Sequence, residues 1–166
     1  QRQMCIRDRL YIGGDVLGQK TFISQKLNSR FLYKEISKNK YAVYSWIQFD
    51  DEVKGYDKAT KTVMNIPGYI DGHKIEVIAE EFTRGCIGVS KVTIPNTVTE
   101  IRRGAFVYTK RIQSISISSS VKTIAADVFS GNNCLKFTVD SNNKYFQAIN
   151  GDLYSKDGKT LSLIHI

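Results

Sequence analysis

Two short stretches near the amino terminus are rich in aromatic and β-branched residues. They cover Phe31 to Ile36 and Tyr41 to Ile47, and the polar segment Ser37 to Lys40 separates them. Two such stretches joined by a short polar turn predict a β-hairpin. The next residues, Asp50 to Lys61, are mostly polar and charged and are expected to form a connector.

Beyond the connector the apolar positions repeat with a period of 23 residues. Ile78, Ile101 and Ile124 share this spacing, and each is followed by a phenylalanine, at Phe82, Phe106 or Phe129. An apolar triplet comes next in each case: Val89, Val92 and Ile94, then Ile112, Ile115 and Ile117, then Leu135, Phe137 and Val139. The first two triplets have the spacing LxxLxL. A period of about 20 to 29 residues with this spacing is typical of leucine-rich repeat solenoids.

Strand alternation gives each repeat a buried face and an exposed face. Val92 and Ile94 point to one side of a short strand, whereas Lys91 and Thr93 point to the other. A single strand of this kind cannot bury its apolar face, but stacked copies align into a parallel sheet and bring the phenylalanines into one core. We therefore expect Phe106 and its equivalents in the other repeats to be buried.

The outward positions of the three repeat strands are the candidate ligand-binding residues. They are Lys91, Thr93, Ser114, Ser116, Lys136 and Thr138. Stacking should place them in two parallel columns, with about 4.8 Å between neighbouring strands. Small hydroxyl side chains flanked by lysines would form a polar, weakly basic surface suited to hydrogen bonding with an extended polymer or a protein edge.

Catalytic and metal-binding patterns are weak. His73, in the segment DGHK, lies near a carboxylate, but no nucleophile motif such as GxSxG accompanies it. We expect it to be a solvent-exposed turn histidine. Cys86 and Cys134 with one histidine do not complete a four-ligand zinc site. Residues 140–143 (DSNN) are only faintly similar to a calcium loop and predict a turn. The expectation is a protein that is not an enzyme and that holds no metal and no cofactor.

The repeat resembles that of the BspA-like, or treponemal-type, leucine-rich repeat family, LxxVxIPxxVxxIgxxAFxxC. The similar residues are Val89 to Arg103 (VSKVTIPNTVTEIRR) with Gly104-Ala105-Phe106, and Ile66 to Val77 and Val139 to Tyr154 are similar to the lead-in and closing segments of the family. The fold expected is a β-rich α/β solenoid of leucine-rich repeats, with about three 23-residue repeats over residues 63–160. Residues 10–62, which contain the β-hairpin, precede it.

Cys86 and Cys134 are expected to remain unpaired with each other. Cys86 falls where the family places a buried core cysteine, so the resemblance implies an inert thiol. Cys86 and Cys134 belong to the first and third repeats and should lie roughly 10 Å apart, two strand spacings. A disulfide requires Cα atoms within about 7 Å.

The two ends of the chain are expected to be non-native. Residues 1–9 (QRQMCIRDR) back-translate to a string that contains GATGTGTATAAGAGACAG, and residues 161–166 (LSLIHI) to its reverse complement. The pair resembles the adapter and transposon-end sequence of shotgun DNA libraries, translated at both ends of a fragment. Residues 10–160 are then a piece of a longer protein, and the two terminal segments should add nothing to the core.

Net charge and hydropathy restrict the classes of partner that we expect. The formal net charge is +8, and it falls to +6 without the three arginines and one aspartate of the terminal segments. A moderate positive charge favours polyanions such as acidic glycans or cell-wall polymers through nonspecific electrostatics. A specific nucleic-acid role is not expected, because aromatic and basic residues are not interleaved as in RNA-binding motifs. No apolar run approaches the roughly 18 residues of a membrane-spanning helix.

The resemblance implies a bacterial cell-surface or secreted module that binds a protein or polymer and takes part in adhesion. Two alternatives remain open. The first is an accessory repeat module of a larger secreted enzyme whose catalytic domain lies outside these residues. The second is an intracellular scaffold. The oligomeric state does not follow from the sequence.

Overall fold

The computed structural model of the chain describes residues 20–24, 29–48, 62–83, 88–107, 109, 111–132 and 136–159. Both terminal segments predicted to be non-native, 1–9 and 161–166, lie outside these ranges. The seven-stranded sheet contains β1 (Lys20–Ser24), β2 (Ser29–Ser37), β3 (Lys40–Gln48), β6 (His73–Ile78), β8 (Glu100–Ile101) and β10 (Thr123–Ile124), with β5 (Tyr69–Ile70) paired to β6. The four-stranded sheet contains β4 (Thr62–Asn65), β7 (Val89–Thr93), β9 (Ser114–Ile117) and β11 (Lys136–Val139). A separate hairpin consists of β12 (Phe146–Ile149) and β13 (Asp152–Ser155).

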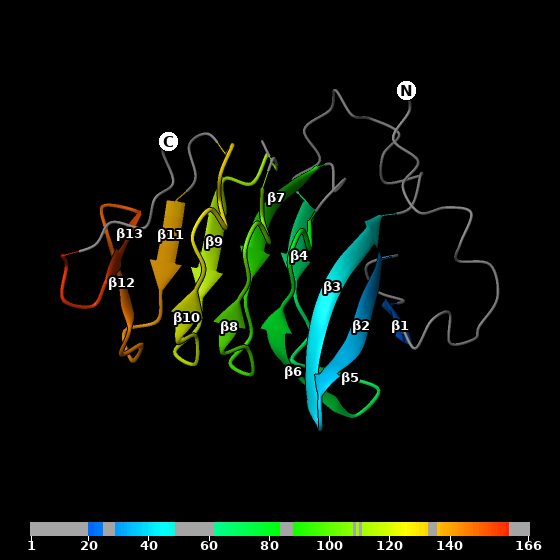
Figure 1. The fold of residues 1–166 in the computed structure, drawn as a ribbon. Coiled ribbons are helices and arrows are strands. Elements are labelled where there is room, and N and C mark those ends of the chain that lie inside the picture. The colour runs from blue at the N-terminus through cyan, green and yellow to red at the C-terminus, as the bar shows by residue number, and fades with distance from the viewer. Residues whose placement is uncertain are drawn as a thin grey trace.

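The predicted amino-terminal hairpin is confirmed by the antiparallel pairing of β2 with β3. Its turn places Asn39 in the left-handed region at φ 59°, and the Asn39 backbone N–H donates to Glu35 Oε1 at 2.7 Å. β3 also pairs in parallel with β6, so the hairpin extends the sheet of the repeats at one end. Figure 1 shows β1 to β3 at this end and β12 and β13 at the other.

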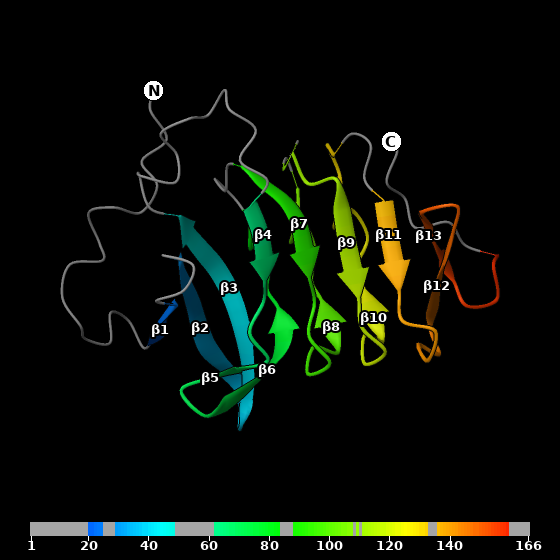
Figure 2. The same cartoon turned by 180° about the vertical axis from the view of Figure 1, so that it is seen from behind.

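The repeats form a leucine-rich repeat solenoid in which successive coils add parallel strands to both sheets. In the four-stranded sheet β4, β7, β9 and β11 pair in parallel in chain order. In the other sheet β6 pairs with β8 and β8 with β10, also in parallel. Figure 2 shows the four arrows of β4, β7, β9 and β11 side by side and pointing the same way.

The helical part of the predicted α/β solenoid is absent from the described residues, where the connections between strands are turns and irregular segments. Turns at residues 103–107 and 126–130 follow β8 and β10. Gly104 at φ 64° and Asp127 at φ 54° have left-handed backbone conformations in these turns. A right-handed helix cannot run through such residues, so these connections are turns in place of the helices of an α/β coil.

The core between the two sheets contains a ladder of phenylalanines, as the repeat predicts. Phe82, Phe106 and Phe129 are at most 1% exposed. The Phe106 ring is stacked on Phe129 with centroids 5.8 Å apart, and it meets Phe82 edge to face at 6.0 Å. Phe129 continues the ladder to Phe137 on β11 at 4.8 Å. One hydrophobic cluster therefore runs through successive coils.

Buried asparagines connect neighbouring coils where backbone groups leave the sheets. Asn143 is 1% exposed, and its side-chain amide donates to the carbonyl oxygens of Ser118 at 2.8 Å and Val121 at 3.0 Å. Its Oδ1 accepts the backbone N–H groups of Tyr145 and Phe146, both at 2.8 Å. The segment 140–143 is the predicted turn, since the Asn143 backbone N–H also donates to the Asp140 carbonyl at 2.9 Å.

The prediction for His73 is wrong in part. His73 follows a turn formed by Asp71 and Gly72, both with positive φ, but it opens β6 and is partly buried. Its ring lies 4.2 Å from that of Tyr41 on β3. The Tyr33 hydroxyl, from β2, donates to Asp71 Oδ2 at 2.6 Å. Packing against the hairpin therefore covers the histidine.

Candidate functional site

The strand register assembles the six candidate residues into the two expected columns on the four-stranded sheet. The first column is Lys91, Ser114 and Lys136, and the second is Thr93, Ser116 and Thr138. Within each column the partners lie directly opposite each other on neighbouring strands, so the spacing along a column is about 4.8 Å. The columns are two residues apart along each strand, about 6.6 Å.

Burial confirms which side of this sheet faces solvent. Val92, Ile115 and Phe137 alternate with the candidate residues and are at most 2% exposed. Lys91 and Lys136, in contrast, are exposed. The alternation of small or charged and bulky apolar residues along each strand therefore places the six side chains outward. Their role in ligand binding stays a prediction.

The structure adds a fourth strand to this surface that the repeat analysis missed. Val63 of β4 lies opposite Lys91, and Asn65 lies opposite Thr93, so both columns extend by one residue. A sequence signal existed, because the MNIP of residues 64–67 has the same form as the VTIP of residues 92–95. The interval of 28 residues hid it, because β5 and the turn that joins it to β6 lie between the two copies.

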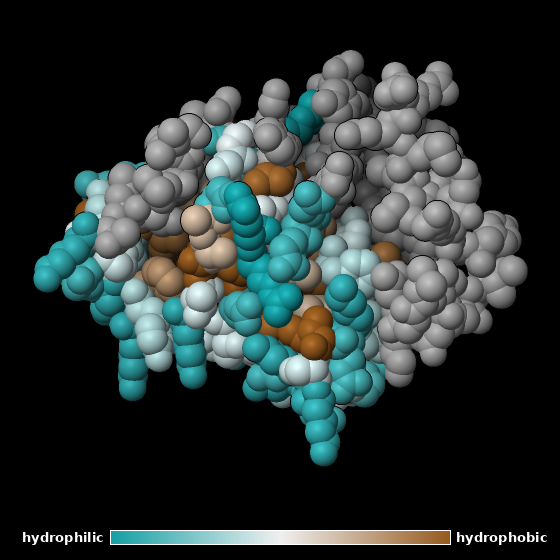
Figure 3. All heavy atoms as spheres, in the orientation of Figure 1, coloured by the Kyte–Doolittle hydropathy of each residue, from teal (hydrophilic) through white to brown (hydrophobic). Residues whose placement is uncertain are grey.

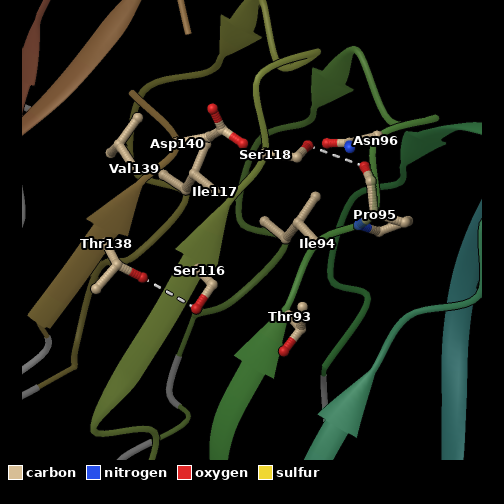
Figure 4. Close-up of a pocket in the computed structure, with 10 residues that line it drawn as sticks. All are labelled: Thr93, Ile94, Pro95, Asn96, Ser116, Ile117, Ser118, Thr138, Val139 and Asp140. Atoms are coloured by element: carbon tan, nitrogen blue, oxygen red, sulfur yellow. Dashed lines mark hydrogen bonds between the residues drawn. The ribbon is translucent and has the colours of Figure 1, made fainter. Parts of the chain in front are cut away.

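An open groove of about 480 Å³ lies at the carboxyl ends of β7, β9 and β11. Its lining residues are Thr93, Ile94, Pro95, Asn96, Ser116, Ile117, Ser118, Thr138, Val139 and Asp140 (Figure 4). We call it the hydroxyl groove, because Thr93, Ser116 and Thr138 of the second column form part of its wall. The turn residues Asn96, Ser118 and Asp140 belong to the groove but were not among the candidates from sequence.

Hydrogen bonds hold the polar groups of the hydroxyl groove in place. The Thr138 hydroxyl donates to Ser116 Oγ at 3.0 Å, from one strand to the next. Ser118 Oγ donates to the carbonyl oxygen of Pro95 at 2.9 Å, which ties two successive turns together. Asp140 Oδ1 accepts the backbone N–H of Asn142 at 2.9 Å. The polar part of the lining thus consists of hydroxyl groups, the Asn96 amide and, at the β11 end, a fixed carboxylate.

Charge is distributed differently on the two sheets. On the seven-stranded sheet, Glu100 lies between Lys40 at 3.2 Å and Arg102 at 2.9 Å. Burial opposes ionisation of this carboxyl, but the hydrogen bonds and charges of Arg102 and Lys40 outweigh it and hold the pKa of Glu100 below its usual range. On the four-stranded sheet the lysines lie beside a serine, Ser114, instead of a carboxylate. The side seen in Figure 3 is mainly hydrophilic, with apolar residues in small patches.

No group of three or more histidine, cysteine, aspartate or glutamate side chains in the described ranges is arranged to hold a metal ion. Cys86 and Cys134 lie outside the described residues, so their pairing stays a prediction. The described part of the chain also contains no helix long and apolar enough to span a bilayer.

The stacked parallel strands and phenylalanine ladder define a leucine-rich repeat protein. Residues 64–156 match the family model "BspA type Leucine rich repeat region (6 copies)". The chain therefore belongs to the BspA-type leucine-rich repeat family.

The solved structures that match the chain include leucine-rich repeat proteins. The protein from Eubacterium ventriosum is 20% identical, with 83% of this chain and 48% of that chain covered and a TM-score of 0.30. The protein from Bacteroides capillosus is 17% identical, with 75% and 99% covered and a TM-score of 0.44. The pneumococcal vaccine antigen PcpA is 13% identical, with 83% and 54% covered and a TM-score of 0.38. The matched region spans about half the length of the Eubacterium protein and of PcpA. No curated protein matches the chain.

Proposed function

We propose that this chain is a non-catalytic binding module of a bacterial cell-surface or secreted protein. Its ligand, a protein or a polymer, binds the solvent-exposed face of β4, β7, β9 and β11. The observation that carries the proposal is the register of six outward polar side chains in two columns across three strands. Repeats of this kind create extended surfaces suited to macromolecules instead of enclosed pockets suited to chemistry.

The composition of this face supports adhesion through many weak contacts. The six candidate residues are lysines, serines and threonines, without the tryptophan, tyrosine or arginine side chains that dominate tight protein interfaces. Each coil therefore contributes little affinity by itself. Repetition along the solenoid raises the total, because linked sites bind together. An extracellular location is part of this proposal, since the surface must meet ligands outside the cell.

Charge reversal tests the proposal directly. In the variant Lys91→Glu, Ser114→Glu and Lys136→Glu, one whole column changes sign on the exposed face. Beads coated with the chain are applied to an epithelial cell layer and to a bacterial cell-wall preparation, and retained beads are counted. We expect the parent chain to retain beads above an albumin coating and the variant to lose most of this retention.

A control variant with the same change in net charge separates site from bulk charge. Lys38→Glu, Lys122→Glu and Thr123→Glu lie at exposed positions outside the four-stranded sheet. This control should retain beads as well as the parent chain. If the column variant folds, by circular dichroism, and adheres like the parent, the binding site lies elsewhere. Retention of the parent at the albumin level would reject the binding module itself.

A further inference from the structure

The direction of the hydroxyl groove selects a class of ligand. Thr93, Ser116 and Thr138 occupy one register position on three neighbouring parallel strands, so the groove crosses the strands instead of following them. The strands are about 4.8 Å apart. A linear polymer in the groove therefore meets an equivalent hydroxyl group at each step of about 4.8 Å.

The step length distinguishes a sugar chain from a peptide. An extended peptide rises about 3.3 Å per residue, and alternate side chains repeat at about twice that distance, so neither interval matches the strand spacing. An extended 1,4-linked pyranose chain advances by close to one strand spacing per ring. Successive rings can therefore lie above Thr93, Ser116 and Thr138 in turn, each within reach of a hydroxyl group.

The two edges of the groove differ in chemistry. On one side lie Lys91 and Lys136, each two residues before the threonine that its strand contributes to the groove. The Lys136 side chain lies over Gly151, where an added Cβ would be 3.4 Å from its Cγ and Cδ. On the other side lie Asn96 and Asp140, which offer amide and carboxylate oxygens as acceptors. The lysine edge suits anionic groups, and its two lysines lie two strand spacings apart, about 9.6 Å.

The wall of the groove combines the hydroxyl column with the apolar side chains of Ile94, Pro95, Ile117 and Val139. None of its ten lining residues is aromatic (Figure 4). Thr93, Ser116 and Thr138 present hydroxyl groups, which can both donate and accept hydrogen bonds, and the Thr138 hydroxyl already donates to Ser116 Oγ. Ring hydroxyl groups of a sugar have the same double capacity, so each can pair without leaving a polar group unsatisfied.

We propose that the hydroxyl groove, together with Lys91 and Lys136, binds a linear 1,4-linked polysaccharide that contains uronic acids. The chain lies across β7, β9 and β11. Successive rings of an extended 1,4-linked chain face opposite ways, so the carboxylates of its first and third rings lie toward Lys91 and Lys136, which are two strands apart. The inference rests on the proposed function, because it names the ligand class of that same surface.

Three probes of equal length test each part of the inference with the whole 166-residue chain. They are fluorescent oligomers of 1,4-linked mannuronate, of cellulose and of glutamate. The cello-oligosaccharide has the same linkage as mannuronate but no charge, and poly-glutamate has the charge but the residue spacing of a peptide. Binding is measured by fluorescence polarisation at low and high salt. We expect mannuronate to bind at least about tenfold more tightly than either other probe, with affinity falling as salt rises.

Two variants separate the contributions of hydroxyl groups and charge. Thr93→Val, Ser116→Ala and Thr138→Val removes three hydroxyl groups with little change in shape and should weaken mannuronate binding about tenfold or more. Lys91→Gln with Lys136→Gln should weaken mannuronate binding and remove most of its salt dependence. The matched control Thr123→Val alters an exposed threonine of β10 on the other sheet and should bind like the parent.

The outcomes distinguish this inference from the proposed function. Equal binding of poly-glutamate and mannuronate, or unchanged mannuronate binding in the folded hydroxyl variant, would show that charge alone attracts the ligand and would overturn the inference. If the parent chain retains beads, the variant of Lys91, Ser114 and Lys136 loses them, and the parent binds no mannuronate, the inference is overturned and the proposed function stands. A parent chain that retains beads only at the albumin level yet binds mannuronate would overturn the proposed adhesion and leave the inference about the groove standing.

Discussion

The phenylalanine ladder makes a quantitative prediction about Phe106→Ala. Phe106 is fully buried, and it is the central ring between Phe82 at 6.0 Å and Phe129 at 5.8 Å. Truncation of a buried phenylalanine costs about 3 to 5 kcal/mol. Since both ring contacts are lost as well, each of about 0.5 to 1.5 kcal/mol in double-mutant cycles, we expect the upper part of that range, about 4 to 5 kcal/mol.

The expected loss is large compared with the whole stability of a domain, about 5 to 15 kcal/mol. Urea unfolding should show it, followed by circular dichroism and by fluorescence of Trp46, which lies in the same core cluster. With a slope of about 2 kcal/mol per M urea, the midpoint should fall by about 2 M. The control Tyr69→Ala removes an aromatic ring that is 61% exposed and should change stability by less than about 0.5 kcal/mol.

A midpoint shift of less than about 0.5 M for Phe106→Ala would refute the reasoning. Such a result would mean that the coils do not share one continuous core and that stability resides in separate parts of the chain. The variants Phe82→Ala and Phe129→Ala extend the test, because each removes a neighbouring ring of the ladder. All three should destabilise the chain by several kcal/mol.

Three further substitutions test other features of the fold. Asn143→Ala should lower the free energy of unfolding in urea by about 3 kcal/mol, because it leaves two carbonyls and two backbone N–H groups without their partner. A decrease of less than about 1 kcal/mol would contradict this role of Asn143. The pKa of Glu100 is lowered in the folded state, so its stabilising contribution is present above the ordinary value of 4.5 and is lost as pH falls through the folded pKa. The stability difference between the parent and Glu100→Gln should therefore be largest near neutral pH and shrink in acid, and a constant difference would exclude this linkage. Gly68→Ala would place a Cβ 3.1 Å from both Cγ2 and Oγ1 of Thr97, so it should destabilise the folded chain by about 1 kcal/mol. A double-mutant cycle should show that this loss disappears when Thr97 is also changed to Ala.

Local pattern was sufficient to predict the elements and their faces. The hairpin around Asn39 followed from two β-rich stretches and a polar turn, and the burial of Phe106 followed from the 23-residue period. The outward direction of Lys91 and Thr93 followed from strand alternation alone. These features depend on residues close together in the chain or on an unbroken repeat, so sequence carries them.

Long-range packing decided the features that the pattern did not predict. His73 was expected in solvent, but Tyr41, 32 positions earlier in the chain, covers its ring. β4 joins the array despite the additional strand β5, because the register of backbone hydrogen bonds to β7 tolerates an irregular interval in sequence. Contacts of this kind depend on which strands pair, and the periodicity of apolar residues along the chain does not predict strand pairing.

The candidate site also has features that the sequence predicts and features that only packing decides. The sequence by itself determined which six side chains point away from the core, because a strand has only two faces and the apolar residues occupy one of them. Only the tertiary structure decided that one column borders a groove. That groove exists because the turns after β7, β9 and β11 bring Asn96, Ser118 and Asp140 to the same edge of the sheet. The positions of those turns are set by hydrogen bonds between coils, such as that from Ser118 Oγ to the Pro95 carbonyl, and such bonds form only when separate repeats stack.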